Sequence, residues 1–125
     1  MSNSIFVLGD GDGIRKKIES YLLNGDLEQV RDFSSSLTEA VREIARLAIQ
    51  NMESRIVFAG GDDICFITTS GNYHEEEMQV LLEHFFRRTG CSISFGAGRN
   101  IEEAFLNLRR AKSMGGGCLV TSALF

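Results

Sequence analysis

Proline and tryptophan are absent from this 125-residue sequence, and no apolar run is long enough to cross a membrane. A membrane-spanning helix needs about 20 predominantly apolar residues in a row. The chain also opens without the basic and apolar leader that marks a secreted protein. We therefore expect a cytoplasmic protein that makes no contact with a membrane.

Cysteine and positive charge are both scarce. The three cysteines form no CxxC pair and lie in apolar segments, so we interpret them as reduced core residues rather than as a metal or redox site. Thirteen Lys and Arg stand against 17 Asp and Glu, which gives a formal net charge of −4. A broad nucleic-acid-binding surface needs an excess of positive charge, so we expect no stable binding of nucleic acid.

Glycine, in contrast, is plentiful and grouped. Apolar and charged fractions of 43% and 24% are those of an ordinary globular protein, and we expect one domain over residues 1–125. Most of the 13 glycines fall in the segments 9–13, 60–61, 96–98 and 115–117. Such groups mark sharp turns or places where a ligand approaches the backbone, so the functional site is expected among them.

The hydrophobic pattern predicts an alternation of strands and helices. Strands are expected at 5–8, 56–59, 64–68, 91–95 and 118–121, and helices at 14–23, 27–52, 75–89 and 101–112. This order, β-α-α-β-β-α-β-α-β, indicates an α+β fold, a ferredoxin-like domain whose antiparallel sheet is packed by helices. The first strand is apolar throughout and is expected to be buried on both faces. Three serines at 34–36 weaken the second helix, where a kink or break could occur.

Four carboxylates follow glycines at two turns. Asp10 and Asp12 come after the first strand, and Asp62 and Asp63 form the tip of the predicted hairpin. In a ferredoxin-like sheet these turns can converge. Two carboxylates about 4 Å apart repel by about 4 kcal/mol at an effective dielectric near 20, so such a cluster is tolerable when divalent cations neutralise it. An all-oxygen site suits Mg²⁺, and two ions could serve an in-line phosphoryl transfer; an ordinary solvated turn is the alternative.

Backbone amides and a lysine are the candidate phosphate ligands. The amides of Gly11, Asp12, Gly13 and Ile14 open a predicted helix, and helix N-termini bind phosphate. Lys112 precedes the glycine run 115–117 at the end of the last helix. We expect it to be exposed and to bind phosphate without contributing to stability. Arg109 and Arg110 lie nearby, but the helix dipole alone explains them equally well.

These motifs resemble those of palm domains. Asp10 after the first strand and Gly60-Gly61-Asp62-Asp63 at the hairpin are similar to GGDEF diguanylate cyclases, the polymerase palm of type III CRISPR complexes and archaeal-type GTP cyclohydrolase III. The GGDD form and the opening residues 8–14 most resemble the minimal CRISPR polymerase (mCpol) family.

The resemblance implies roles for the site residues. Asp10, Asp62 and Asp63 would be catalytic and bind metal, with Asp63 holding a metal or activating the attacking hydroxyl. The carbonyl of Gly11 would help to hold a metal, and Lys112 would grip phosphates. Gly60 and Gly61 would contact the nucleotide together with the residues that open the first helix, namely Gly11, Asp12, Gly13 and Ile14. Ile18 and Leu27 occupy the positions where GGDEF domains read guanine, so the likeness does not extend to that base.

The resemblance also implies a reaction. The chain would be a metal-dependent nucleotidyltransferase with two Mg²⁺ or Mn²⁺ ions per site. It would condense nucleoside triphosphates, with ATP preferred, into a cyclic di- or oligonucleotide and release pyrophosphate. The product would be an antiviral signal sensed by a separate effector protein. Because so small a palm has few surfaces for two triphosphates, we expect a homodimer. A GTP cyclohydrolase III-like enzyme and a non-catalytic nucleotide-binding palm are the alternatives.

Overall fold

The computed structural model describes residues 3–122. Its elements follow the predicted order, and their bounds are β1 (Ser4–Gly11), α1 (Ile14–Leu23), α2 (Leu27–Met52), β2 (Arg55–Gly60), β3 (Asp63–Thr69), α3 (Glu75–Thr89), β4 (Ile93–Gly98), α4 (Ile101–Ser113) and β5 (Leu119–Thr121). The predicted α+β fold is confirmed. None of the helices in the described part of the chain has the length and apolarity that crossing a membrane requires.

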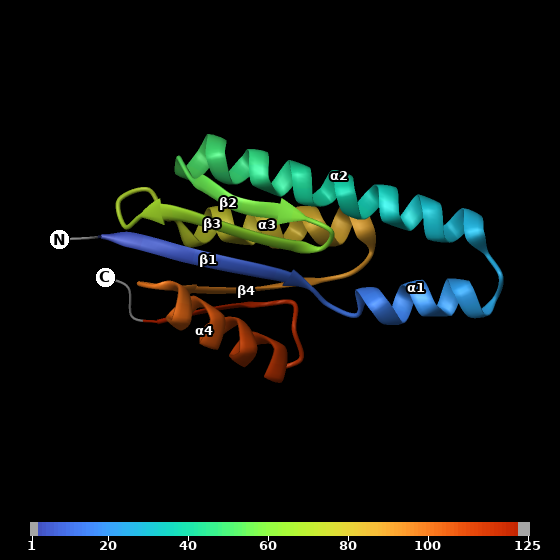
Figure 1. Ribbon diagram of the computed structural model, residues 1–125. Coiled ribbons are helices and arrows are strands. Elements are labelled where there is room, and N and C mark those ends of the chain that lie inside the picture. Colours follow the sequence, from blue (N-terminus) through green and yellow to red (C-terminus); the bar gives the residue numbers. More distant parts are fainter. Residues whose placement is uncertain (1–2, 123–125) are drawn as a thin grey trace.

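A five-stranded sheet forms the centre of the molecule, in the order β2-β3-β1-β4-β5. All neighbouring strands are antiparallel except β4 and β5, which are parallel. The register between β2 and β3 shifts between Ile56 and Phe58, which places a bulge in this edge strand. The central strand β1 runs toward α1 and ends beside the β2–β3 hairpin tip (Figure 1).

Helices pack on both faces of this sheet. On one face, apolar side chains of α2 and α3 form the main core with buried strand residues such as Val7, Phe66 and Phe95. On the other face, α4 packs against β1, β4 and β5 (Figure 1). The end of β1 and the hairpin tip therefore lie at one end of the sheet, where α1 begins.

Three local expectations differ from the structure. Inward residues of β1 are buried but the alternate ones are only partly so, because the strand alternates between a main-core face and a less covered one. Helix α2 continues through the serine triplet without a break, since its apolar stripe is buried on both sides of these serines. Strand β4 starts at Ile93 instead of residue 91, because the Thr89 hydroxyl bonds both the amide and the carbonyl of Cys91 and holds a turn there.

Candidate active site

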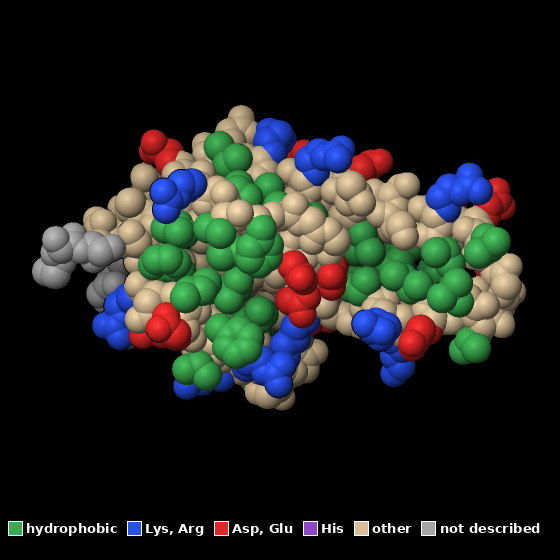
Figure 2. Space-filling view, viewed as in Figure 1, with side chains coloured by type: hydrophobic (Ala, Val, Ile, Leu, Met, Phe, Trp, Pro, Cys, Tyr) green, Lys and Arg blue, Asp and Glu red, His purple; other side chains and the backbone are tan. Residues whose placement is uncertain are grey.

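Three of the predicted carboxylates meet at the end of β1. The strand register pairs Asp10 with Asp63, and the amide of Gly11 donates to the carbonyl of Asp62 at 3.0 Å. One oxygen from each of Asp10, Asp62 and Asp63 lies within 4.8 Å of the others. These three residues are called the acid cluster below, and Figure 2 shows acidic side chains gathered beside basic ones on this face.

A glycine at position 11 allows this close approach. A Cβ atom placed there would lie 2.7 Å from Cγ1 of Ile14 and 3.1 Å from Cβ of Asp62. Those separations are too short for a real side chain, so any larger residue pushes the hairpin tip away from β1. Gly60 and Gly61 complete the tip, and both are exposed.

The acid cluster is poorly neutralised by the protein itself. A hydrogen bond with the Asp10 carboxylate, together with burial and the charges of Asp62 and Asp10, raises the pKa of Asp63 to about 7. Burial, and then the charge of Asp10, also raises the pKa of Asp62. Carboxylate oxygens are the donors that Mg²⁺ and Mn²⁺ prefer. The donor set therefore fits a divalent cation, whose charge would remove the repulsion.

The raised pKa of Asp63 predicts how stability changes with pH. An unfolded chain releases this proton near pH 4, whereas the folded protein keeps it up to about 7. The free energy of unfolding of the metal-free protein should thus fall as pH rises through this window. We expect a loss of about 1–2 kcal/mol, a figure reduced for solvent screening because Asp63 is exposed.

Thermal unfolding in chelator at about pH 5 and about pH 8 measures this change. Asp63→Asn should remove most of the slope, while Asp32→Ala, which deletes an exposed carboxylate on α2, should keep it. An unchanged slope in Asp63→Asn would contradict the assignment.

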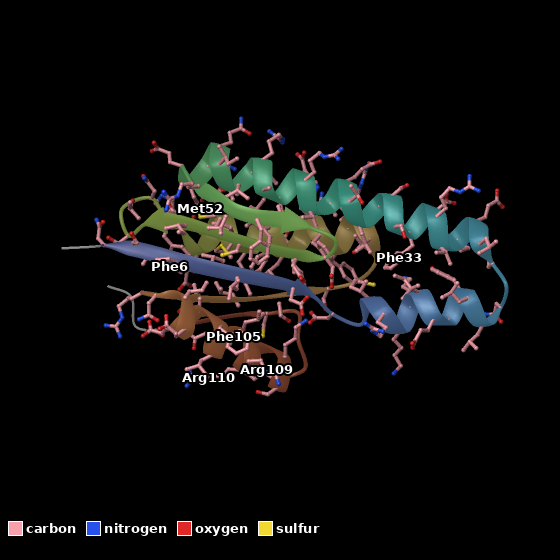
Figure 3. All side chains as sticks on the ribbon, in the orientation of Figure 1. Phe6, Phe33, Met52, Phe105, Arg109 and Arg110 are labelled. Atoms are coloured by element: carbon pink, nitrogen blue, oxygen red, sulfur yellow. The ribbon has the colours of Figure 1, made fainter. Side chains whose placement is uncertain are left out.

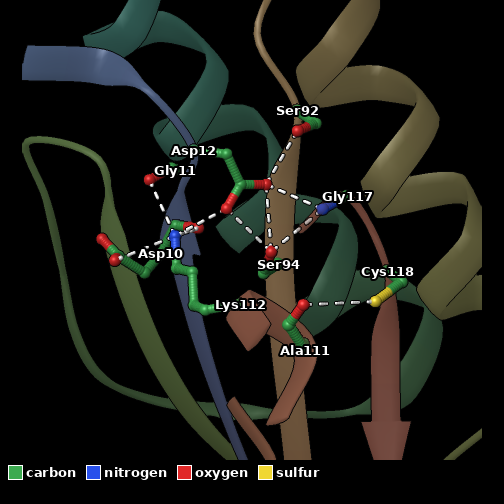
Figure 4. Close-up of polar contacts among 9 residues, drawn as sticks. All are labelled: Asp10, Gly11, Asp12, Ser92, Ser94, Ala111, Lys112, Gly117 and Cys118. Atoms are coloured by element: carbon green, nitrogen blue, oxygen red, sulfur yellow. Dashed lines mark hydrogen bonds and ion pairs between the residues drawn. The ribbon is translucent and has the colours of Figure 1, made fainter. Parts of the chain in front are cut away.

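Lys112 lies against the acid cluster, as Figure 4 shows. Its Nζ is 2.6 Å from Oδ1 of Asp12, 3.1 Å from Oδ2 of Asp10, and 3.0 Å from the carbonyl oxygens of both Asp10 and Gly11. Burial opposes the charge, but hydrogen bonds to Asp12 and Asp10 outweigh it and raise the pKa of Lys112. Only 27% of the side chain is exposed, so the expectation of an exposed lysine is wrong. The wide coverage comes from β1, which the sequence does not place beside α4.

Asp12 does not join the acid cluster. Its Oδ2 accepts hydrogen bonds from Ser92, Ser94 and the amide of Gly117 at 2.7, 3.0 and 2.8 Å, and Oδ1 accepts from Ser94 and Lys112. Burial works against the carboxylate, but these bonds outweigh it and lower the pKa of Asp12. The expected convergence of four acids is therefore wrong for Asp12, because β1 ends at Gly11 and the next residue turns toward β4.

The amides at the start of α1 are only partly available. The amide of Gly11 bonds to Asp62, and that of Asp12 donates to the carbonyl of Ser92 at 2.9 Å. Of the four amides predicted to bind phosphate, Gly13 and Ile14 remain at the helix N-terminus. Gly13 itself is the N-cap and adopts a left-handed conformation.

An open cavity of about 650 Å³ lies beside the acid cluster. Two of the acids and one face of α1 line it, namely Asp10, Ile14, Arg15, Ile18, Glu19, Leu22 and Asp62. Sequence reasoning missed the polar pair in this wall, Arg15 and Glu19. Their four-residue spacing puts them on one face of a helix, and this spacing is the signal that could have identified them.

The two arginines of α4 do not reach the acid cluster in the same way as Lys112. Arg110 donates to the side chain of Asn107 at 2.7 Å, and Asn107 is buried and bonds to the carbonyl of Ala97. Arg109 is the next residue along the same helix (Figure 3). Lys112 is thus the cation that α4 contributes to this site through contacts in the described residues.

Comparisons with known proteins bear on the fold and the family. A chain of the Csm1–Csm4 cassette in complex with cA4 matches with a TM-score of 0.76 and 17% identity, over 95% of this chain and 21% of that one. A chain of the same cassette with one ATP gives 0.72 and 17%, over 91% and 20%. The active GGEEF domain of a diguanylate cyclase from Vibrio cholerae gives 0.59 and 14%, over 94% and 81%. No curated protein matches the sequence significantly.

These identities establish similarity of fold alone, and this chain spans about a fifth of the length of the Csm1–Csm4 chains that it matches. The family is shown by sequence. Residues 6–122 match the minimal CRISPR polymerase domain, which takes in the acid cluster, Asp12 and Lys112. With nearly all of its length matched, the chain belongs to the minimal CRISPR polymerase (mCpol) family.

Proposed function

We propose that this chain is a metal-dependent nucleotidyltransferase that condenses nucleoside triphosphates, preferably ATP, into a cyclic di- or oligonucleotide and releases pyrophosphate. The observation that carries the proposal is the convergence of Asp10, Asp62 and Asp63 beside Lys112 and a cavity large enough for a nucleoside. Support for adenine comes from the similar Csm1–Csm4 cassettes, which were solved with ATP, pppApA and cA4.

The side chains divide the work by their chemistry. The acid cluster and the carbonyl of Gly11 would hold the Mg²⁺ or Mn²⁺ ions, two per site. When bound, the ions would neutralise charge on the phosphates and polarise the reacting oxygens. Lys112 and the amides of Gly13 and Ile14 would bind the triphosphate.

In the reaction itself, a ribose hydroxyl oxygen of one nucleotide bonds to the α-phosphorus of another. The bond from that phosphorus to the bridging oxygen of pyrophosphate breaks. Asp63, whose pKa is about 7, is suited to accept the hydroxyl proton near neutral pH. The apolar wall of the cavity, formed by Ile14, Ile18 and Leu22, would contact the nucleoside.

The cell biology follows from the family. In this proposal the product is a signal in antiviral defence, made in the cytoplasm and detected by a separate effector protein. The name of the family, minimal CRISPR polymerase, supports this setting.

A homodimer is the proposed assembly. One small palm has little surface with which to hold two triphosphates, and an apolar surface adjoins the acids. Val57 and Phe58 of β2 are 56% and 49% exposed, and Phe105 of α4 is 53% exposed; Figure 2 shows apolar side chains next to the acidic patch. Analytical ultracentrifugation should find a dimer that Phe58→Ser weakens. A monomer at all concentrations would contradict this assembly.

Product mass tests the reaction. The protein is incubated with each of the ribonucleoside triphosphates and Mg²⁺ or Mn²⁺, and the products are analysed by mass spectrometry. Condensation yields joined nucleotides and pyrophosphate. A monomer that has gained water would instead support the GTP cyclohydrolase III-like alternative. Saturable binding without any turnover would support a non-catalytic palm.

Metal binding should depend on the nucleotide. In the free protein Lys112 already contacts Asp10 and the carbonyl of Gly11, and a substrate would supply further oxygen ligands. We therefore expect weak Mg²⁺ binding to the protein alone and much tighter binding with a non-hydrolysable triphosphate. Calorimetry measures both, with Asp63→Asn as the control that should lose the tight binding. Tight Mg²⁺ binding that the nucleotide does not change would contradict this prediction.

A further inference from the structure

Asp12 joins four separate segments of the chain through one carboxylate. It lies at the end of β1 and accepts hydrogen bonds from α4 through Lys112, from β4 through Ser94, from the residue before β4 through Ser92, and from the α4–β5 loop through Gly117. Only 17% of its side chain is exposed. Figure 4 shows these contacts converging on the two carboxylate oxygens.

These contacts leave Asp12 unsuited to bind a metal. Each oxygen already accepts at least two hydrogen bonds, and Asp12 is not among the acids whose oxygens come together. Its partners include an ammonium and a backbone amide, which can only donate. Whatever Asp12 contributes to the site must therefore pass through the groups that it holds.

The most consequential of these groups is the Lys112 ammonium. Its shortest contact, 2.6 Å, is with Asp12, whereas its contacts with Asp10 and Gly11 are 3.0–3.1 Å. Asp12 therefore draws the ammonium to one side of Asp10. Without that carboxylate, the remaining negative charges near Lys112 belong to the acid cluster, and the ammonium would be free to move toward it.

The glycine loop is fitted to the same carboxylate. A Cβ atom at Gly116 would lie 2.8 Å from both Cγ and Oδ1 of Asp12, while one at Gly115 meets no atom within 4 Å. Both glycines have a positive φ, 77° and 102°. Alanine at either position is thus strained by the backbone, but only alanine at position 116 collides with Asp12.

We infer that Asp12 is a positioning residue, which fixes the Lys112 ammonium beside the acid cluster so that the ammonium can contact the phosphates of a bound triphosphate. The inference rests on the proposed function for its ligand, a nucleoside triphosphate. It assigns Asp12 a role distinct from the metal-binding acids, although all four follow glycines in similar turns.

Asparagine is a stringent replacement for Asp12. It keeps the shape of the side chain but turns one acceptor oxygen into an NH₂ donor. With the NH₂ at the Oδ1 position it faces the ammonium of Lys112, and at the Oδ2 position it faces the amide of Gly117. The two serine hydroxyls can rotate to accept, but the ammonium and the amide cannot. Asp12→Asn should therefore release one of these two groups in either orientation.

The first experiment needs no ligand. In ¹⁵N spectra of the free protein, a lysine ammonium held by hydrogen bonds exchanges its protons slowly enough to be observed, and the Lys112 signal is identified by its loss in Lys112→Ala. We expect the signal in the wild type and in Gly115→Ala, and its loss in Asp12→Ala and Gly116→Ala. A Lys112 signal that persists in Asp12→Ala would overturn the inference, whatever reaction the protein catalyses.

The second experiment is a double-mutant cycle on binding of a non-hydrolysable ATP analogue with Mg²⁺. Asp12→Ala and Lys112→Ala should each weaken binding about tenfold or more. The double variant should bind no more weakly than the poorer single one, because Asp12 acts through Lys112. Losses that multiply would overturn the inference, since a residue with a merely structural role would act independently of Lys112.

The two experiments also separate this inference from the proposed function. If the cycle shows the expected coupling and the wild type forms no joined nucleotide, the proposed reaction fails while the role of Asp12 stands. If joined nucleotides form and the losses multiply, the reaction stands and the role of Asp12 fails.

Discussion

Replacing Asp62 or Asp63 by alanine is expected to abolish product formation while leaving the metal-free protein as stable as the wild type or slightly more stable at about pH 8. Turnover is lost because each residue supplies a carboxylate to the acid cluster. Stability is kept because the charge of Asp10 and burial disfavour the ionised forms of both residues, as their raised pKa values indicate. Removing one charge relieves repulsion within the cluster.

Activity is measured by mass spectrometry with Mg²⁺ or Mn²⁺, and stability by thermal melts in chelator. Asp32→Ala serves as the control for loss of an exposed carboxylate outside the site. A drop of several degrees in Tm for Asp62→Ala or Asp63→Ala would mean that these residues hold the hairpin tip in place, and the assignment as a catalytic cluster would fall.

Lys112→Ala should lower kcat/KM by about tenfold to hundredfold, which corresponds to one lost charge-assisted contact of about 1.5–3 kcal/mol. Both the apparent KM and the maximal rate should change, because the ammonium would bind the triphosphate and stabilise charge on the departing pyrophosphate. The structure adds a cost that an exposed lysine would not carry. With Asp10 and Asp12 left unpaired, we expect a loss of about 1–2 kcal/mol in the free energy of unfolding.

Steady-state kinetics and urea unfolding test both parts, with Lys16→Ala on the exposed side of α1 as the matched loss of one positive charge. Arg109→Ala is measured in parallel. Wild-type kinetics in Lys112→Ala together with impaired kinetics in Arg109→Ala would move the phosphate-binding role to the arginine and show that the segment was assigned incorrectly.

Much of the fold could be predicted because its signals are local. Apolar runs bounded by glycines gave the strands, and the four turn residues between two such runs gave the hairpin that carries Asp62 and Asp63. The meeting of these acids with Asp10 needed one further step, the pairing of β1 with β3, which the ferredoxin-like order supplies and the register confirms. The catalytic roles of these residues remain predictions.

The surroundings of Asp12 and Lys112 could not be predicted in the same way. Asp12 has the same glycine neighbours as Asp10, yet one residue beyond the end of β1 it turns toward Ser92 and Ser94, which lie 80 and 82 residues away in the chain. No local pattern marks two serines as partners of a distant carboxylate. The coverage of Lys112 likewise depends on how α4 lies across β1, which is a property of packing and not of helix periodicity.

The two edges of the sheet limit how copies of this chain can associate. Strand β2 carries an irregular register between Ile56 and Phe58, and β5 is only three residues long. Unpaired backbone groups on a long, flat edge strand would invite another chain to extend the sheet, and bulges and short strands suppress such pairing. Open-ended growth into fibres is therefore disfavoured at both edges, and contact between copies is directed to the faces of the molecule, where it closes on itself.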